Sequence, residues 1–162
     1  MAVIDIGAGA TNRGNYLAIS SWTNLDQSNA ANLSGVLDVF EAWAQTSITS
    51  LKIGVFSGSG FAYTSRDSEV LGAVTSGSKQ TFTGKNCDVV AGDFIAIYAT
   101  DGNIELDTTG GPFYRTSGDK FGAGLTTFTG GPETYTMSLY ATGTGTTTGI
   151  PIFMNQYRQR WN

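Results

Sequence analysis

Short runs of alternating apolar and polar residues, separated by turn-forming residues, are the main pattern along this chain. The clearest run covers residues 94–100 (FIAIYAT), which is β-branched and aromatic and too short for a helix, so it predicts a strand. Asp101 and Gly102 follow, and residues 103–107 (NIELD) alternate again. Because Asp-Gly suits the positive φ angles of a type I′ turn, the sequence predicts a tight β-hairpin between these two strands.

The predicted hairpin has one apolar face and one face that mixes aromatic and acidic side chains. Pairing Thr100 with Asn103 places Tyr98 opposite Glu105, and side chains then alternate between the two faces. The apolar face comprises Ile95, Ile97, Ala99, Ile104 and Leu106, and the other face comprises Phe94, Tyr98, Glu105 and Asp107. A slip by one residue would expose the apolar set to water, so the register should be firm. A site on this hairpin would therefore lie on the second face.

The remaining pattern predicts further short strands joined by loops and turns. They are expected over residues 2–6, 16–22, 51–56, 61–64, 69–74, 79–83, 87–90, 113–116 and 135–142. Residues 24–34 are polar and rich in turn-forming residues, which predicts a loop. Turn signals about every 8 to 12 residues between short strands are typical of a β-sandwich or jelly roll. The sequence thus predicts an all-β fold, an antiparallel jelly-roll β-sandwich with a C-terminal extension.

Residues 35–44 (GVLDVFEAWA) are the segment with a genuine helical alternative. A strand would place Leu37, Val39 and Trp43 on one face. A helix would align Val36, Phe40 and Trp43 in one stripe. We favour the strand. Inward-facing positions are clearer in two other strands, where we expect Leu51, Ile53 and Val55 in one, and Tyr135, Met137, Leu139 and Ala141 in the other.

Composition and charge narrow the class of protein. At 162 residues the chain is most simply one domain, and 40% hydrophobic residues suffice for a core. Only 14% of residues are charged, against roughly 25% in ordinary soluble domains, so Ser, Thr, Asn and Gly must cover much of the surface. The net charge is −4 and the nine lysines and arginines are scattered, which argues against a nucleic-acid partner.

The N-terminus and the cysteine content bear on where the protein is made. No basic segment followed by an apolar core opens the chain, and no apolar run has the length of a transmembrane helix. We therefore expect synthesis in the cytoplasm without a signal peptide, and no membrane insertion. Cys87 is the single cysteine, so an intrachain disulfide is excluded.

The absence of histidine removes the catalytic and metal-binding chemistries that depend on imidazole. Glu105 and Asp107 remain, with Cα atoms roughly 6.5–7 Å apart on one strand face, a separation that overlaps the range used by glycosidase carboxylates. Glycosidase carboxylates, however, normally flank a cleft and come from different strands. We therefore expect a non-enzymatic protein.

The same acidic segment invites comparison with calcium-binding loops. Oxygen-bearing side chains alternate from Asp101 to Asp107, but an EF-hand needs glycine at its sixth position and glutamate at its twelfth. Counted from Asp101, those positions are Leu106 and Pro112, so the EF-hand comparison fails. We expect no cofactor, and a Ca2+ site of another type on the sandwich loops stays an open alternative.

Aromatic side chains are candidates for stacking on sugars. The set is Trp22, Trp43, Tyr63, Tyr98 and Tyr114. Most aromatic residues in a sandwich belong to its core. Tyr98 is the best candidate, because the predicted register places it away from the core face and beside the carboxylates of Glu105 and Asp107. These three residues form the predicted carbohydrate-binding site, with a cell-surface glycan as its ligand.

The C-terminal residues change abruptly in character. Residues 144–149 form a Thr/Gly linker, and residues 150–162 (IPIFMNQYRQRWN) place aromatic residues at every fourth position. The apolar stripe comprises Ile150, Phe153, Met154, Tyr157 and Trp161. A helix of this length alone in water is marginal, so the segment should become ordered only by docking. It either folds back onto its own domain, residues 1–143, or docks on a neighbouring subunit as a helix or an added strand, and we favour the neighbour.

Two segments together resemble a known class of domain. Residues 77–84 (GSKQTFTG), followed by residues 89–98 (VVAGDFIAIY), resemble the penultimate strand, Gly-Asp turn and long strand of single jelly-roll β-sandwiches. The chain is similar in this respect to phage-encoded virion proteins, such as decoration and fibre proteins, and to carbohydrate-binding modules. Together with this resemblance, a compact sandwich without a catalytic set, the few charges and the aromatic tail after a linker lead us to expect a structural subunit of a virion or other extracellular assembly. Such a subunit, a capsid decoration or tail-fibre component, would form homo-oligomers or join other structural subunits. The alternative is a carbohydrate-binding module or an adhesin-type surface-binding domain.

Overall fold

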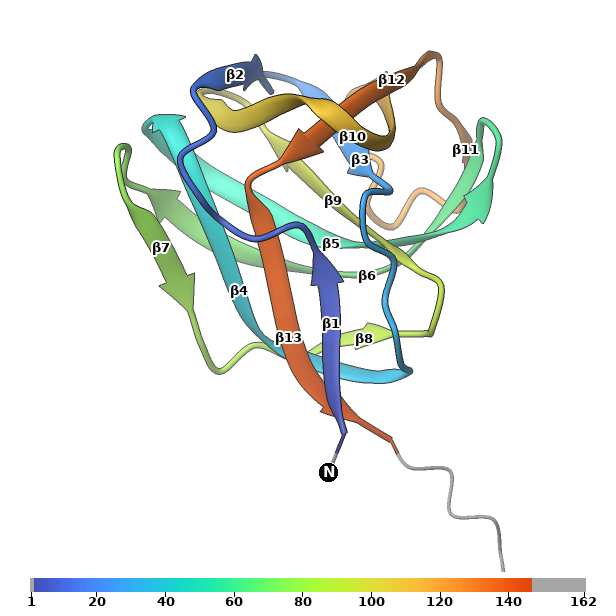
Figure 1. Cartoon of the computed structure of the whole chain (residues 1–162). Coiled ribbons are helices and arrows are strands. Elements are labelled where there is room, and N and C mark those ends of the chain that lie inside the picture. The colour runs from blue at the N-terminus through green and yellow to red at the C-terminus, as the bar shows by residue number, and fades with distance from the viewer. Residues whose placement is uncertain (1, 147–162) are drawn as a thin grey trace, which may run out of the picture.

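Thirteen β-strands make up the described part of the chain, residues 2–146, in this computed structural model (Figure 1). They are β1 (Val3–Gly7), β2 (Asn15–Ala18), β3 (Trp22–Asp26), β4 (Gly35–Thr46), β5 (Ile48–Ser59), β6 (Ala62–Val74), β7 (Lys79–Phe82), β8 (Cys87–Val89), β9 (Phe94–Ala99), β10 (Asn103–Ser117), β11 (Leu125–Thr127), β12 (Gly130–Met137) and β13 (Leu139–Gly145). Every pairing between these strands is antiparallel. The prediction of an all-β antiparallel fold is therefore confirmed.

The strands form one large sheet that does not close on itself. Its main path runs β1-β13-β4-β10-β3-β9-β5-β6-β11, with β2 and β12 paired to β10 and with β7 and β8 paired to β4. Figure 1 shows β1, β13 and β4 lying across from β5, β6 and β9. The strand order establishes the all-β class but does not establish a jelly roll.

The main core lies between these two parts of the sheet. Ile4, Ile6, Leu37, Phe40, Leu139 and Ala141 come from β1, β4 and β13, and Leu51, Ile53, Val55, Ile95 and Ile97 come from β5 and β9. All of these side chains are fully buried. Their burial confirms the predicted inward positions of Leu51, Ile53 and Val55. Tyr135, Met137, Leu139 and Ala141 also belong to this core or pack against it, as predicted, but the single strand predicted over residues 135–142 is wrong, because β12 ends at Met137 and β13 begins at Leu139.

A second, smaller cluster covers the other face of β3, β9 and β5. It comprises Leu25, Phe56, Tyr63, Ala96, Tyr114 and Phe128, with Phe94 and Phe121 packed against it. The ring centroid of Phe56 lies 5.2 Å from that of Phe121 and 5.7 Å from that of Phe128, so residues that follow β10 close over the sheet. The face of β9 that carries Phe94 is therefore partly buried, and it is not the open surface that the sequence predicted.

The predicted Asp-Gly hairpin is wrong in its pairing. β9 pairs with β3 and β5, whereas β10 pairs with β2, β3, β4 and β12. Tyr98 consequently lies opposite Thr23 and Lys52, and Glu105 lies opposite Tyr16. The predicted apolar set of the two strands is nevertheless buried in one core, with no side chain more than 3% exposed.

Long-range contacts at the Asp-Gly turn explain why the two strands separate. Asp101 accepts hydrogen bonds from the hydroxyl of Thr49 and from its backbone N–H, the latter at 3.0 Å, and these bonds hold the pKa of Asp101 below its usual value. Gly102 has a φ of +82°, and a Cβ there would lie 2.5 Å from Cγ1 of Ile48. The turn is thus packed against the start of β5, and Asp-Gly serves as a corner between two parts of the sheet.

Residues 35–44 form part of β4, so the strand interpretation is confirmed and the helical alternative is wrong. The predicted shared face of Leu37 and Val39 is also wrong, because a β-bulge places Asp38 as an extra residue between them. Beyond the bulge the alternation inverts, so Phe40 points into the core while Val39 is only partly buried.

Several segments differ in extent from the prediction. Residues 24–26 of the predicted loop belong to β3, and the predicted strand at residues 113–116 is the second half of the long β10. β13 continues to Gly145, so it enters the range 144–149 that the sequence assigns to a linker. The rest of that linker and the arm, residues 150–162, lie outside the described residues.

Candidate functional site

The predicted carbohydrate-binding residues Tyr98, Glu105 and Asp107 do not meet on one surface. Tyr98 on β9 is partly buried and lies next to Lys52 on β5. Glu105 and Asp107 on β10 instead face the loop between β1 and β2. Glu105 is 6% exposed and accepts the backbone N–H of Arg13 at 3.0 Å. Much of the hydrogen-bonding capacity of the two carboxylates is therefore used by the protein's own loop.

Arg13 is the centre of this cluster. Its Nη1 donates to Oδ2 of Asp107 at 2.6 Å, and its Nε donates to Oγ of Ser138 at 2.8 Å. Its Nη2 donates to the carbonyl oxygens of Ala8 at 2.7 Å and Gly9 at 2.9 Å. Every guanidinium nitrogen is thus bonded within the chain, and the side chain is 11% exposed. The cluster ties the loop after β1 to β10 and to the junction of β12 and β13, which is a structural role.

The aromatic residues considered as sugar platforms differ in their surroundings. Tyr63 and Tyr114 belong to the second core cluster, and the guanidinium of Arg115 covers the ring of Trp22 at 4.8 Å. Tyr16 on β2 is 58% exposed, although the sequence pattern does not single it out. It lies opposite Glu105 of β10, a pairing that local alternation does not reveal.

A second buried network surrounds Asp26. Its Oδ1 accepts the N–H of Ser28 at 2.7 Å and the hydroxyl of Ser28 at 2.5 Å, and its Oδ2 accepts the N–H of Met137 at 2.6 Å. The hydroxyls of Ser28 and Thr136 lie 3.0 Å apart. Burial raises the pKa of Asp26 above its ordinary value, although these hydrogen bonds act in the opposite direction. The network joins β3 to β12 through bonds within the chain, so it too is structural.

Within residues 2–146, no three His, Cys, Asp or Glu side chains are grouped closely enough to hold a metal ion. The acidic run considered for calcium is dispersed. Asp101 binds Thr49 at the start of β5, whereas Asp107 binds Arg13 in the loop after β1. The same part of the chain contains no helix that is both long and apolar enough to span a membrane.

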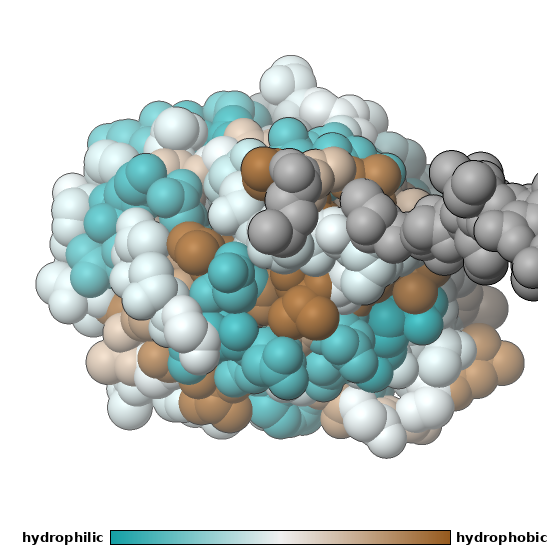
Figure 2. Space-filling view, turned by 90° about the horizontal axis from the view of Figure 1, so that it is seen from below, coloured by the Kyte–Doolittle hydropathy of each residue, from teal (hydrophilic) through white to brown (hydrophobic). Residues whose placement is uncertain are grey.

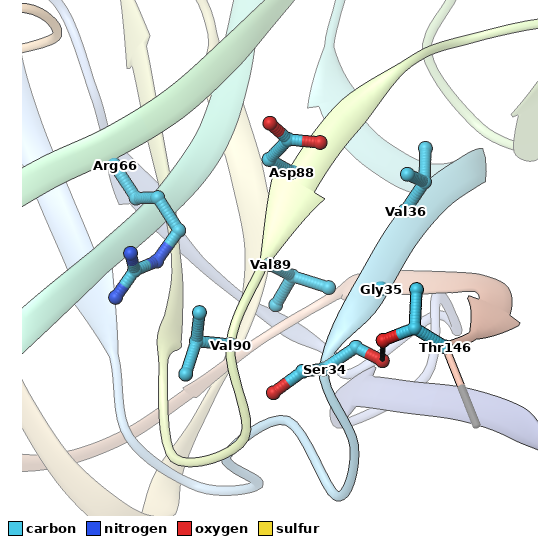
Figure 3. A pocket seen from close by; sticks show the side chains of 8 residues that line it. All are labelled: Ser34, Gly35, Val36, Arg66, Asp88, Val89, Val90 and Thr146. Carbon is cyan, nitrogen blue, oxygen red and sulfur yellow. Dashed lines mark hydrogen bonds between the residues drawn. The ribbon is translucent and has the colours of Figure 1, made fainter. Parts of the chain in front are cut away.

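A hollow of about 360 Å³ lies at the end of the molecule where the described chain leaves the sheet (Figure 3). It is lined by Ser34, Gly35, Val36, Arg66, Asp88, Val89, Val90 and Thr146, which we call the exit hollow. These residues come from the start of β4, from β6, from β8 and the turn after it, and from the end of β13. Thr146 donates its N–H to the carbonyl of Ser34 at 2.9 Å, so the C-terminal segment departs from the rim of this hollow.

The exit hollow combines apolar and charged side chains. Figure 3 shows Val89 between Arg66 on one side and Val36 on the other. Val90 is 41% exposed. Arg66 bonds to Asp93 through both Nη2, at 3.1 Å, and Nε, and this pairing raises the pKa of Arg66. The lining thus combines three valines with polar and charged side chains, among them Asp88.

Apolar side chains also lie around this end of the molecule. Val3, at the start of β1, is 63% exposed and lies opposite Thr144 in β13. Figure 2 views the molecule from this end and shows hydrophobic atoms gathered among hydrophilic ones. Apolar surface next to a charged hollow suits a protein contact better than a small polar ligand.

The predicted interface residues Ile150, Phe153, Met154, Tyr157 and Trp161 lie outside the described residues, so their docking stays a prediction. No protein-family model, no curated protein and no solved structure matches this chain. Geometry and sequence pattern therefore carry the functional assignment.

Proposed function

We propose that this protein is a non-enzymatic structural subunit of a virion or other extracellular assembly, such as a capsid decoration protein or a tail-fibre component. Its C-terminal arm, residues 150–162, docks on a neighbouring subunit. The observation that carries this proposal is the position of Thr146, which brings the start of the C-terminal segment to the exit hollow and the exposed valines. An aromatic arm that departs from an apolar surface suits contacts between subunits.

The hydrogen bonds and the small number of the charged side chains support the same proposal. Arg13, Asp26 and Asp93 bind groups of their own chain, so they hold loops and strands in place. Only 14% of residues are charged, which lowers the free-energy cost of removing surface from water when subunits associate. We include in this proposal that the domain is a jelly roll. Two parts of its sheet pack against one core, as the two sheets of a jelly roll do.

Electron microscopy and light scattering of the full chain test the assembly function. We expect oligomers or larger particles whose mass rises with protein concentration, because each copy carries both an arm and an apolar end. A chain that stays monomeric at every concentration would contradict an assembling subunit.

Carbohydrate binding by a surface module or adhesin is the alternative function, and the exposed ring of Tyr16 favours it. A glycan array should then show binding that Tyr16→Ala abolishes. Phe61→Ala is the matched control, since Phe61 is a comparably exposed aromatic residue at 46% and should be silent. An array on which the unaltered protein binds nothing would rule out this alternative.

A further inference from the structure

We propose that the exit hollow is the docking site for the C-terminal arm of a second copy of this chain, through its basic and aromatic residues 157–161 (YRQRW). This assignment rests on the proposed assembly function and specifies where the arm binds. The volume of the hollow, the acidic side chains beside it and the hydrogen bonds along the β1 edge favour this occupant.

The exit hollow has the size and lining for one large aromatic side chain. Its volume of about 360 Å³ lies near the lower end of the roughly 300–1,000 Å³ range of ligand pockets. Val36, Val89 and Val90 supply apolar surface, whereas the guanidinium of Arg66 is paired with Asp93 on the far side of Val89 from Val36. Trp161 suits this environment, because an indole ring buries a large apolar area and keeps an N–H for the polar rim.

The surface beside the exit hollow is acidic. Asp88 lines it, and the carboxylate of Asp67 on β6 accepts the N–H of Asp88 at 2.8 Å. Glu69 lies two positions further along β6. Arg66, which also lines the hollow, is already paired with Asp93. A basic segment would therefore be attracted to this rim.

The arm is complementary to this acidic surface. It carries Arg158 and Arg160, and residues 147–162 contain no acidic side chain. Since the whole chain has nine basic and thirteen acidic residues, residues 1–146 have seven basic and thirteen acidic ones. The two arginines lie between aromatic residues in the sequence YRQRW, so an aromatic ring that enters the hollow brings a guanidinium to its acidic rim.

The occupant that we assign is the arm of a second copy. Thr146 itself lines the exit hollow, and ten residues, 147–156, separate it from Tyr157, so the arm of the same copy is the competing occupant. The proposed function requires contacts between subunits, and reciprocal exchange of arms would fill both hollows in a closed twofold dimer.

The edge strand β1 offers the arm little opportunity for strand addition. The N–H of Asp5 donates to Oδ1 of Asn32 at 2.8 Å, and the N–H of Asn32 donates to the carbonyl of Asp5 at 3.2 Å. The N–H of Gly7 donates to the carbonyl of Asn29 at 3.0 Å. Asn29 and Asn32 thus occupy backbone groups of β1 with which an added strand would have to form hydrogen bonds. Side-chain insertion into the exit hollow is the better use of the arm.

A charge exchange on the full chain tests this assignment by light scattering. Asp88→Arg reverses the rim, and Arg158→Asp combined with Arg160→Asp reverses the arm. Each change alone should weaken association by about tenfold through like-charge repulsion, and combining them should restore it. Glu133→Arg reverses an exposed acidic residue on β12, remote from the hollow lining, and should leave association unchanged. Circular dichroism of each variant confirms that it is folded.

Val90→Asn tests the apolar lining separately, because it adds a polar group without changing the charge of the rim. It should weaken association by about tenfold, because the incoming ring would bury an amide group. Assembly that is lost in a chain ending at Thr148 but unchanged in the Asp88 and Val90 variants would overturn the exit hollow and leave the assembly function standing. A monomeric full chain would overturn both. If Asp88→Arg altered the tryptophan fluorescence of the protein without altering its mass, the arm would lie in its own hollow, and docking on a second copy would be overturned.

Discussion

At the scale of single residues, Arg13 joins three separate parts of the chain through its guanidinium. It bonds to Asp107 on β10, to Ser138 between β12 and β13, and to carbonyl oxygens of the loop after β1. We predict that Arg13→Ala lowers the free energy of unfolding by about 2–4 kcal/mol, because partly buried acceptors lose a charged donor. Urea denaturation would show this loss as a lower midpoint with an unchanged slope.

Lys79 provides a matched control for this prediction. Its amino group bonds to Glu41 at 2.9 Å, but the lysine side chain is 47% exposed, so Lys79→Ala should cost about 1 kcal/mol or less. Equal losses of stability in the two variants would contradict the structural role of Arg13.

The contacts of Arg13 with Glu105 and Asp107 could not be predicted from the sequence. Glu105 and Asp107 alternate along a strand, and that local pattern indicates an acidic face which could meet a ligand. Arg13, which binds both, lies 92 and 94 positions away along the chain. No local pattern identifies a partner at that distance. The sequence therefore predicted that the two carboxylates lie on one strand, but not that Arg13 binds both of them.

At the scale of elements, the corner between β9 and β10 depends on Gly102. Its φ is +82°, and an added Cβ would lie 2.5 Å from a side-chain carbon of Ile48 and 2.9 Å from the carbonyl oxygen of Ser47. Gly77 has nearly the same φ, +81°, but open space around it. We predict that Gly77→Ala costs about 1–2 kcal/mol through its backbone conformation alone. Gly102→Ala should cost a further 1–3 kcal/mol or so, because it also overpacks the corner.

Chemical denaturation of these two glycine variants measures the difference directly. A Gly102→Ala loss no larger than that of Gly77→Ala would mean that the corner is not packed against β5 as the structure describes it.

Elements were predictable from periodicity, whereas their partners were not. Alternation identified the strand at residues 94–100 and the inward side chains of β5, because burial of one face leaves a period of two in the sequence. Asp-Gly predicts a type I′ turn, but only Gly102 of the pair has a positive φ, and the turn residues could not reveal that β9 and β10 pair with other strands. The bulge at Asp38 likewise depends on the register with β13, which the sequence of β4 does not contain.

At the scale of the whole molecule, one end brings together the features that favour association. The exit hollow, the exposed Val3 and the departing chain at Thr146 all lie there. The arm was recognisable from its aromatic stripe, since that pattern lies within one short segment. The hollow was not, because its lining comes from β4, β6, β8 and the end of β13, which only the folded sheet brings together.

The mass of the full chain and of a chain ending at Thr148, measured by light scattering over the same concentrations, tests the role of the arm most directly. We predict that the full chain forms oligomers, while the shortened chain is a monomer with the same circular dichroism spectrum and unfolding midpoint. Equal masses for the two chains, whether both are assembled or both are monomeric, would contradict assembly through the arm.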